Sequence, residues 1–143
     1  VVALGEGAVV AVSEMSAEGT RLAGLRTRML DRLRVDHGDM FVNGAMDRRV
    51  PGNLNVGFPG VDAEALMTAL ESVAISTGSA CTSASVEPSY VLRALGLDDA
   101  DAGASIRIGF GRFTTETEVD IAADMIAAAV GTQRSDSSVR AAE

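Results

Sequence analysis

Two short stretches of alternating apolar and polar residues constrain the fold of this chain more than any other feature. Each stretch places three apolar side chains on one side of a strand: Leu54, Val56 and Phe58 in residues 53–58, and Ile106, Ile108 and Phe110 in residues 104–110. The opposite side carries polar residues and glycine. A sheet with one apolar face must bury that face against another layer. We therefore expect a small sheet covered by helices.

Helical periodicity near both ends of the chain predicts two helices that could cover the sheet. Apolar residues recur at steps of three and four in residues 13–35, at Leu22, Leu25, Met29 and Leu33. Thr115 and Glu118 have the spacing of a capping box and predict the start of a second helix. The apolar face of this helix is formed by Val119, Ala122, Ile126, Ala129 and Val130. From residue 132 the sequence is polar, so we expect one domain at 1–131 and a disordered tail at 132–143.

Shorter elements are expected in the middle of the chain. They are strands at 40–43 and 73–75, a helix at 63–72, and a helix between Pro88 and Gly96. Asp62 can cap the helix at 63–72, whose buried edge we expect to be Leu66, Met67 and Leu70. We expect the acidic run 98–101 to be a loop. This order of elements predicts an α+β fold with a small mixed or antiparallel sheet.

Composition excludes several classes of function. The net charge is −8 and no basic stripe is present, so we expect no nucleic-acid partner. No apolar run reaches the roughly 18 to 20 residues that span a bilayer, and we expect a cytoplasmic protein. The single cysteine excludes an intrachain disulfide and a cysteine-rich metal site, and we expect no metal.

The twelve basic residues are all arginines, so the chain has no lysine. No side-chain amine is therefore available for a Schiff base with an aldehyde cofactor. The chain also begins with Val1 rather than methionine, and we expect it to continue a longer protein.

Two residues are candidates for chemistry. Cys81 lies among small and hydroxyl-bearing residues in 76–85, which favours an accessible thiol, although a small buried cysteine is the alternative. Arg107 falls on the polar side of the strand at 104–110, where its guanidinium could bind a carboxylate through two hydrogen bonds. The alternative is a solvated arginine, or one paired with a nearby acid. We expect His37 to be a solvated loop residue and the glycines at 109–111 to form a turn.

Three segments resemble cysteine desulfurases, most closely the branch that serves iron–sulfur cluster assembly. Residues 76–97 resemble the active-site cysteine segment and read STGSACTSASVEPSYVLRALGL. Residues 105–120 resemble the segment that follows it and read SIRIGFGRFTTETEVD. The strand at 51–58 also fits its place in the family. The resemblance extends from about residue 13 to residue 131. It implies that this chain is the C-terminal small domain of an enzyme with the class-V aminotransferase fold. Enzymes of this kind depend on pyridoxal phosphate.

The resemblance also implies a reaction and its residues. The family converts L-cysteine to L-alanine with pyridoxal phosphate, which a lysine outside this chain would bind. Cys81 would take the sulfur as a persulfide, and Arg107 would bind the substrate carboxylate. Arg112 matches a second arginine with a structural role, whereas the family usually has serine in place of Gly109.

The implied partners are sulfur-acceptor proteins such as an iron–sulfur scaffold, and intact relatives are homodimers. We expect this chain to be inactive by itself. A non-catalytic persulfide carrier or docking module, and a remnant that folds poorly, are the alternatives.

Overall fold

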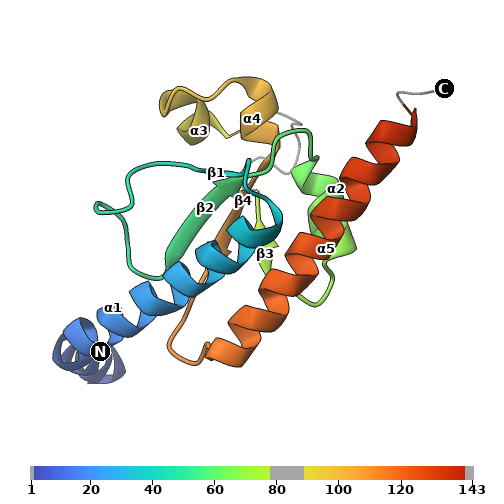
Figure 1. Cartoon of the computed structure of the whole chain (residues 1–143). Coiled ribbons are helices and arrows are strands. Elements are labelled where there is room, and N and C mark those ends of the chain that lie inside the picture. The colour runs from blue at the N-terminus through green and yellow to red at the C-terminus, as the bar shows by residue number, and fades with distance from the viewer. Residues whose placement is uncertain (1, 78–88, 141–143) are drawn as a thin grey trace.

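The computed structural model describes residues 2–77 and 89–140 (Figure 1). Their elements are, in chain order, α1 (Val2–Asp36), β1 (Phe41–Val42), β2 (Asn53–Gly57), α2 (Ala63–Ala69), β3 (Ile75–Ser76), α3 (Tyr90–Ala94), α4 (Asp99–Gly103), β4 (Ser105–Gly109) and α5 (Glu116–Arg140). The predicted α+β fold is confirmed. The predicted strand at 73–75 lies later in the chain, at Ile75–Ser76.

The four strands form one antiparallel sheet in the order β1-β2-β4-β3. β2 and β4 lie at its centre, and they pair with each other along their whole length. Leu54, Val56, Phe58 and Ile106 are completely buried, so the predicted alternation is confirmed. Position 57 needs glycine because it lies beside β1, where a Cβ atom would be 2.1 Å from the Phe41 ring.

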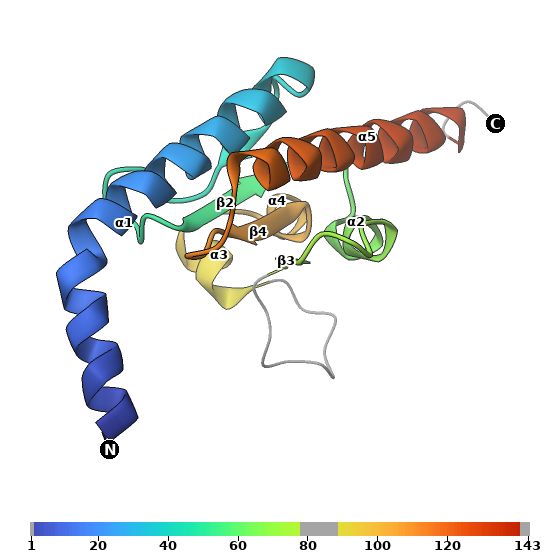
Figure 2. The ribbon, with the colours of Figure 1, turned by 90° about the horizontal axis from the view of Figure 1, so that it is seen from below.

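Helices α1 and α5 lie side by side on the apolar face of the sheet (Figure 2). Leu25, Met29 and Leu33 of α1 are buried in this layer, together with the unpredicted Leu30. In α5, Val119, Ala123, Ile126 and Val130 are buried, whereas the predicted Ala122 and Ala129 are only partly buried. These side chains and the apolar face of the sheet form the core.

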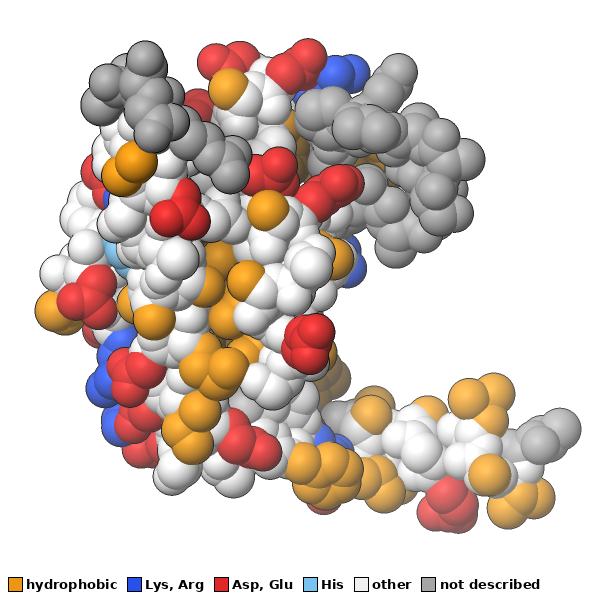
Figure 3. All heavy atoms as spheres, turned by 90° about the vertical axis from the view of Figure 1, so that its right-hand side faces the viewer, with side chains coloured by type: hydrophobic (Ala, Val, Ile, Leu, Met, Phe, Trp, Pro, Cys, Tyr) orange, Lys and Arg blue, Asp and Glu red, His pale blue; other side chains and the backbone are white. Residues whose placement is uncertain are grey.

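Helix α1 begins at Val2, well before the expected start at residue 13. All residues from 2 to 17 are exposed, and this part of the helix projects from the body (Figure 2). Apolar side chains gather along the projecting arm (Figure 3), among them Leu4, Val9 and Val12. Among the described residues, no helix is both long enough and apolar enough to cross a membrane.

Helix α5 continues to Arg140, past residue 131, where we expected a disordered tail to begin. Long-range polar contacts hold this helix against the body at Gln133 and Arg134. The Gln133 amide accepts a hydrogen bond from the backbone N–H of Asp62 and donates one to its carbonyl, at 3.1 and 3.2 Å. Arg134 forms two hydrogen bonds to the Asp39 carboxylate, at 3.0 and 2.8 Å. The assignment of residues 1–131 as one domain stays a prediction.

Three local predictions were wrong in detail. The acidic run 98–101 is not a loop: Asp98 caps α4 by accepting a hydrogen bond from the backbone N–H of Asp101 at 2.8 Å. Helix α2 ends at Ala69, and Met67 is exposed because its side chain lies off the buried edge formed by Leu66 and Leu70. Asp62 does cap α2, as predicted.

Candidate functional site

Arg107 lies on the polar face of the sheet, opposite the two covering helices. Its neighbours on the adjacent strands are Asn55 of β2 and Ser76 of β3. Asn43, directly after β1, pairs its backbone N–H with the Asn55 carbonyl at 3.0 Å. Four polar side chains therefore form one row across the sheet, in the order Asn43, Asn55, Arg107 and Ser76. The predicted position of Arg107 on the polar face is confirmed by its exposure between the buried residues Ile106 and Ile108.

The Arg107 guanidinium has no hydrogen bond or ion pair within the described parts of the chain. Most other described arginines are engaged: Arg28, Arg32, Arg93, Arg112 and Arg134 each pair with an Asp or Glu from another segment. Arg21 and Arg49 bind backbone carbonyls. None of the acidic residues that the structure describes pairs with Arg107, so within residues 2–77 and 89–140 its guanidinium remains available to an external anion.

Buried hydrogen bonds hold the side chains at the β1 end of this row in place. The Asn43 amide donates hydrogen bonds to Asn55 Oδ1 at 2.7 Å and to Ser105 Oγ at 2.9 Å. The Ser105 hydroxyl donates to the Asp101 carbonyl at 2.7 Å. Asn43 and Ser105 are 5% and 0% exposed, so this network is shielded from water. Alternation in the sequence placed Asn55 on the polar face, but the sequence did not indicate that Asn43 and Ser105 contact each other.

Cys81 lies outside the described residues. Chain connectivity nevertheless limits its distance from Arg107, because Ser76 is paired with Arg107 and Cys81 follows five residues later. An extended chain spans at most about 3.6 Å per residue, so the Cα atoms of Ser76 and Cys81 are separated by no more than about 18 Å.

Arg112 and Gly109 lie close to Arg107 in sequence but have different surroundings. Arg112 forms ion pairs with Glu14 and Glu18 of α1, at 2.7 and 3.1 Å, which connect the turn after β4 to that helix. These contacts support the structural role we expected for Arg112. Gly109 borders open space, since a Cβ atom there would meet nothing within 4 Å.

His37 is not the solvated loop residue that we expected. It is 7% exposed, its Nε2 lies 3.0 Å from the Ala127 carbonyl of α5, and its ring stacks edge-on against Phe58 at 5.7 Å. Local polarity gave the wrong prediction because the end of α1 packs against α5. Within the described residues, no three His, Cys, Asp or Glu side chains converge as a metal site would require.

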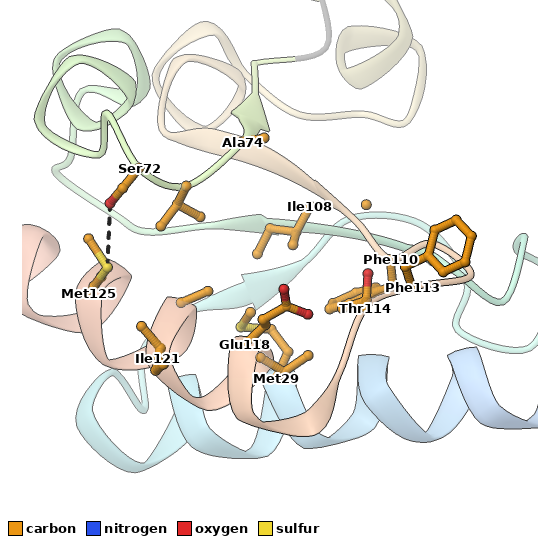
Figure 4. Close-up of a pocket in the computed structure, with 14 residues that line it drawn as sticks. Met29, Ser72, Ala74, Ile108, Phe110, Phe113, Thr114, Glu118, Ile121 and Met125 are labelled. Atoms are coloured by element: carbon orange, nitrogen blue, oxygen red, sulfur yellow. Dashed lines mark hydrogen bonds between the residues drawn. The ribbon is translucent and has the colours of Figure 1, made fainter.

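A groove of about 520 Å³ opens between α5 and the edge of the sheet at β3 and β4 (Figure 4). Its lining is mostly apolar and includes Ile108, Phe110, Ile121 and Met125, but not Arg107. Its polar side chains have local partners: Ser72 Oγ lies 3.8 Å from Met125 Sδ, and Glu118 binds Thr115. The described lining of the groove therefore shows no arrangement for catalysis.

The chain does not fit covalent binding of the pyridoxal phosphate that the family resemblance implies. It contains no lysine, so it has no ε-amine to form a Schiff base with the cofactor aldehyde. The chain therefore has no side chain that could bind the cofactor covalently. The guanidinium of Arg107, which has no partner among the described residues, has the geometry to bind a carboxylate.

Known proteins are similar in sequence to most of this chain. The protein named cysteine desulfurase IscS from Aeromonas hydrophila is 51% identical over 134 residues, which are 94% of this chain and 33% of that protein. The protein of the same name from Vibrio cholerae is 51% identical over 130 residues, 91% of this chain and 32% of its relative. The chain thus spans about a third of the length of the curated relatives it matches.

Solved structures show the same fold. A NifS-like protein matches with a TM-score of 0.72 at 24% identity, covering 86% of this chain and 31% of that one. A NifS-like protein from Rickettsia africae matches with a TM-score of 0.69 at 16% identity, covering 84% and 31%. A family model described as aminotransferase class-V matches residues 2–121. This chain therefore belongs to the class-V aminotransferase family.

Proposed function

We propose that this chain is the sulfur-accepting and carboxylate-binding part of a cysteine desulfurase, which converts L-cysteine to L-alanine. The relatives named above support the activity. The observation that carries the proposal is the guanidinium of Arg107, which has no partner among the described residues and lies beside β3, the strand that precedes Cys81. A carboxylate held by Arg107 would bring a small amino acid within reach of that thiol.

Each residue has a defined role in the proposed reaction. Arg107 binds the carboxylate of L-cysteine through paired N–H···O hydrogen bonds. The Cys81 thiolate attacks the sulfur of the substrate, so that a sulfur–sulfur bond forms as the carbon–sulfur bond breaks. Pyridoxal phosphate, when bound, would accept the electron pair left on carbon as this bond breaks, and a proton added to that carbon gives L-alanine. Because this chain has no lysine to bind that cofactor covalently, we expect a lysine-bearing segment or subunit to complete the site.

The persulfide on Cys81 would then pass its outer sulfur to a thiol of an acceptor protein. Acceptors in iron–sulfur cluster assembly or in thiolation are the expected partners. The complete enzyme is expected to be a cytoplasmic homodimer. A free thiol has a pKa of about 8.5, so only a minor fraction of Cys81 is expected to be thiolate near neutral pH unless the completed site promotes its deprotonation.

A chimera tests this function directly. Residues 2–131 replace the matching part of the Aeromonas hydrophila enzyme, and the chimera is incubated with L-cysteine and pyridoxal phosphate. We expect alanine formation and a mass gain of one sulfur atom on the peptide that contains Cys81. Cys81→Ser should abolish the mass gain, and Arg107→Ala should raise KM for L-cysteine by roughly 100-fold, the range for truncating one partner of a charged hydrogen-bonded pair. A folded chimera that forms alanine but never a persulfide at Cys81 would disprove the proposal.

A non-catalytic persulfide carrier is the second candidate, favoured by the lack of lysine. The chain alone, mixed with L-cysteine and pyridoxal phosphate, should release no alanine under either proposal. The two differ when the unmodified chain is mixed with an intact desulfurase. Rapid persulfide formation on Cys81 of the separate chain would favour the carrier, whereas persulfide formation only within the chimera would favour the desulfurase.

A further inference from the structure

We propose that Asn55 is a second carboxylate-binding residue, and that the buried pair Asn43 and Ser105 sets the orientation of its amide. This inference rests on the proposed function, because it assigns a further residue to the carboxylate site of Arg107. It follows from the directions of the hydrogen bonds on the polar face of the sheet.

The direction of the network is fixed at Ser105. Its hydroxyl hydrogen is donated to the Asp101 carbonyl, which can only accept. The Ser105 oxygen therefore acts as an acceptor towards Asn43, 2.9 Å away. Asn43 must turn its NH₂ group towards Ser105, and this group also donates to the side chain of Asn55 at 2.7 Å. Asn55 must accept that bond through its carbonyl oxygen.

This assignment leaves the NH₂ group of Asn55 directed away from Asn43. It has no acceptor among the described residues. Asn55 is paired with Arg107 across the strands, and side chains in such pairs lie about 5 Å apart at Cβ. Two groups that can only donate, an amide NH₂ and a guanidinium, thus lie side by side on one face. Neither satisfies the other, but one carboxylate could accept hydrogen bonds from both.

The same orientation keeps Arg107 available. If the Asn55 amide were reversed, its carbonyl oxygen could accept a hydrogen bond from the guanidinium and compete with a substrate. Asn43 would then face the NH₂ group of Asn55 with its own NH₂ group. One buried N–H of Asn43 would lose its acceptor, in a side chain whose Oδ1 already has no partner among the described residues. Burial of Asn43 and Ser105 makes that reversal costly. The network therefore acts as a positioning device for the amide that contacts the carboxylate.

Side-chain NMR on the isotopically labelled chain tests this inference, with acetate as the probe. We expect acetate to shift the Arg107 Nε–H and Asn55 NH₂ signals together, with one dissociation constant. Asn55→Ala should weaken acetate binding about tenfold, the effect expected for one hydrogen bond to a charged group. Asn55→Asp should weaken it further, because a carboxylate on that side chain can pair with Arg107. Asn53→Ala is the matched control: Asn53 lies on the same strand and face, opposite Gly109, and its removal should change the affinity less than twofold.

Ser105→Ala tests the orientation without touching the ligand. It should weaken acetate binding and shift the Asn55 NH₂ signals, because alanine cannot accept the hydrogen bond from Asn43 and so no longer fixes the orientation of the Asn43 amide. If this variant does not fold, the acetate affinities of the Asn55 and Asn53 variants are sufficient to test the inference. Equal acetate affinities in Asn55→Ala and the unmodified chain would overturn the inference. Arg107→Ala distinguishes that outcome from failure of the carboxylate site itself. If Arg107 binds acetate, this variant should lose binding. If the carboxylate site is wrong, this variant should bind acetate as well as the unmodified chain does.

Discussion

Gly109 shows how a single residue beside Arg107 can be tested without disturbing the fold. Its φ angle is not in the left-handed region, and a Cβ atom there would contact nothing within 4 Å. Gly109→Ser should therefore stabilise the chain by about 0.5 kcal/mol, because glycine loses more conformational freedom on folding. Urea denaturation measures the change.

Gly57→Ser is the matched control on the same face of the sheet. A Cβ atom at residue 57 would overlap the Phe41 ring, so this variant should be destabilised by about 1–3 kcal/mol. If Gly109→Ser were destabilised to a similar extent, the space beside Arg107 would not be open as described.

The residues of the site were only partly predictable from the sequence. Alternation placed Arg107 and Asn55 on a polar face, because side-chain direction in a strand depends only on the parity of the position. That Asn55 and Arg107 are partners depends on the register between β2 and β4, across about fifty residues of chain. The burial of His37 similarly depends on contact with α5, which local polarity does not encode.

At the scale of elements, the start of α5 depends on the capping box that the sequence predicted. The backbone N–H of Thr115 donates to Glu118 Oε2 at 2.8 Å, and Thr115 Oγ1 accepts from the Glu118 N–H at 3.2 Å. Thr115→Ala should reduce the free energy of unfolding by about 1 kcal/mol, whereas Thr115→Ser should retain most of it. Chemical denaturation distinguishes the two variants, and equal losses in both would show that the hydroxyl does not cap the helix.

The pairing of α1 with α5 should depend on pH through Asp120. Arg28 donates two hydrogen bonds to this carboxylate at 2.7 and 2.8 Å, and they hold the pKa of the Asp120 carboxyl below its ordinary value of 3.8. A lowered pKa in the folded state means that the carboxylate stabilises the fold above about pH 4 and loses this effect as the pH falls through the folded-state pKa.

Asp120→Asn should therefore be less stable than the unmodified chain at pH 7, and this difference should shrink below about pH 4. Added salt should also reduce it, because the pair is exposed. Asp31→Asn, in α1, is the control, since Asp31 forms no ion pair within the described residues. A difference that persists unchanged at pH 2.5 to 3 would contradict an electrostatic origin.

At the scale of the whole molecule, the chain consists of a packed body and a projecting helical arm (Figure 3). The arm buries almost nothing: Leu4, Val9 and Val12 are 80%, 64% and 69% exposed. Removing residues 1–12 should leave the midpoint of thermal unfolding unchanged and should reduce self-association, since exposed apolar surface promotes association. Calorimetry and light scattering measure these two effects.

Changing Leu4, Val9 and Val12 to glutamine in the full chain provides the matched control, because it keeps the length of the arm. This variant should show the same reduction in self-association. A lower unfolding midpoint after removal of residues 1–12 would show instead that the arm packs against the body.

The sequence by itself determined the strands, the two covering helices, the caps of α2 and α5, and the absence of a side-chain amine for the cofactor. These properties depend on residue type or on neighbours within four positions, so they can be deduced without knowing the fold. Only the tertiary structure decided the strand order, the row from Asn43 to Ser76, the burial of His37 and the continuation of α5 past residue 131. Each of these depends on contacts between distant segments, whose free energy is gained only when the sheet and helices pack together.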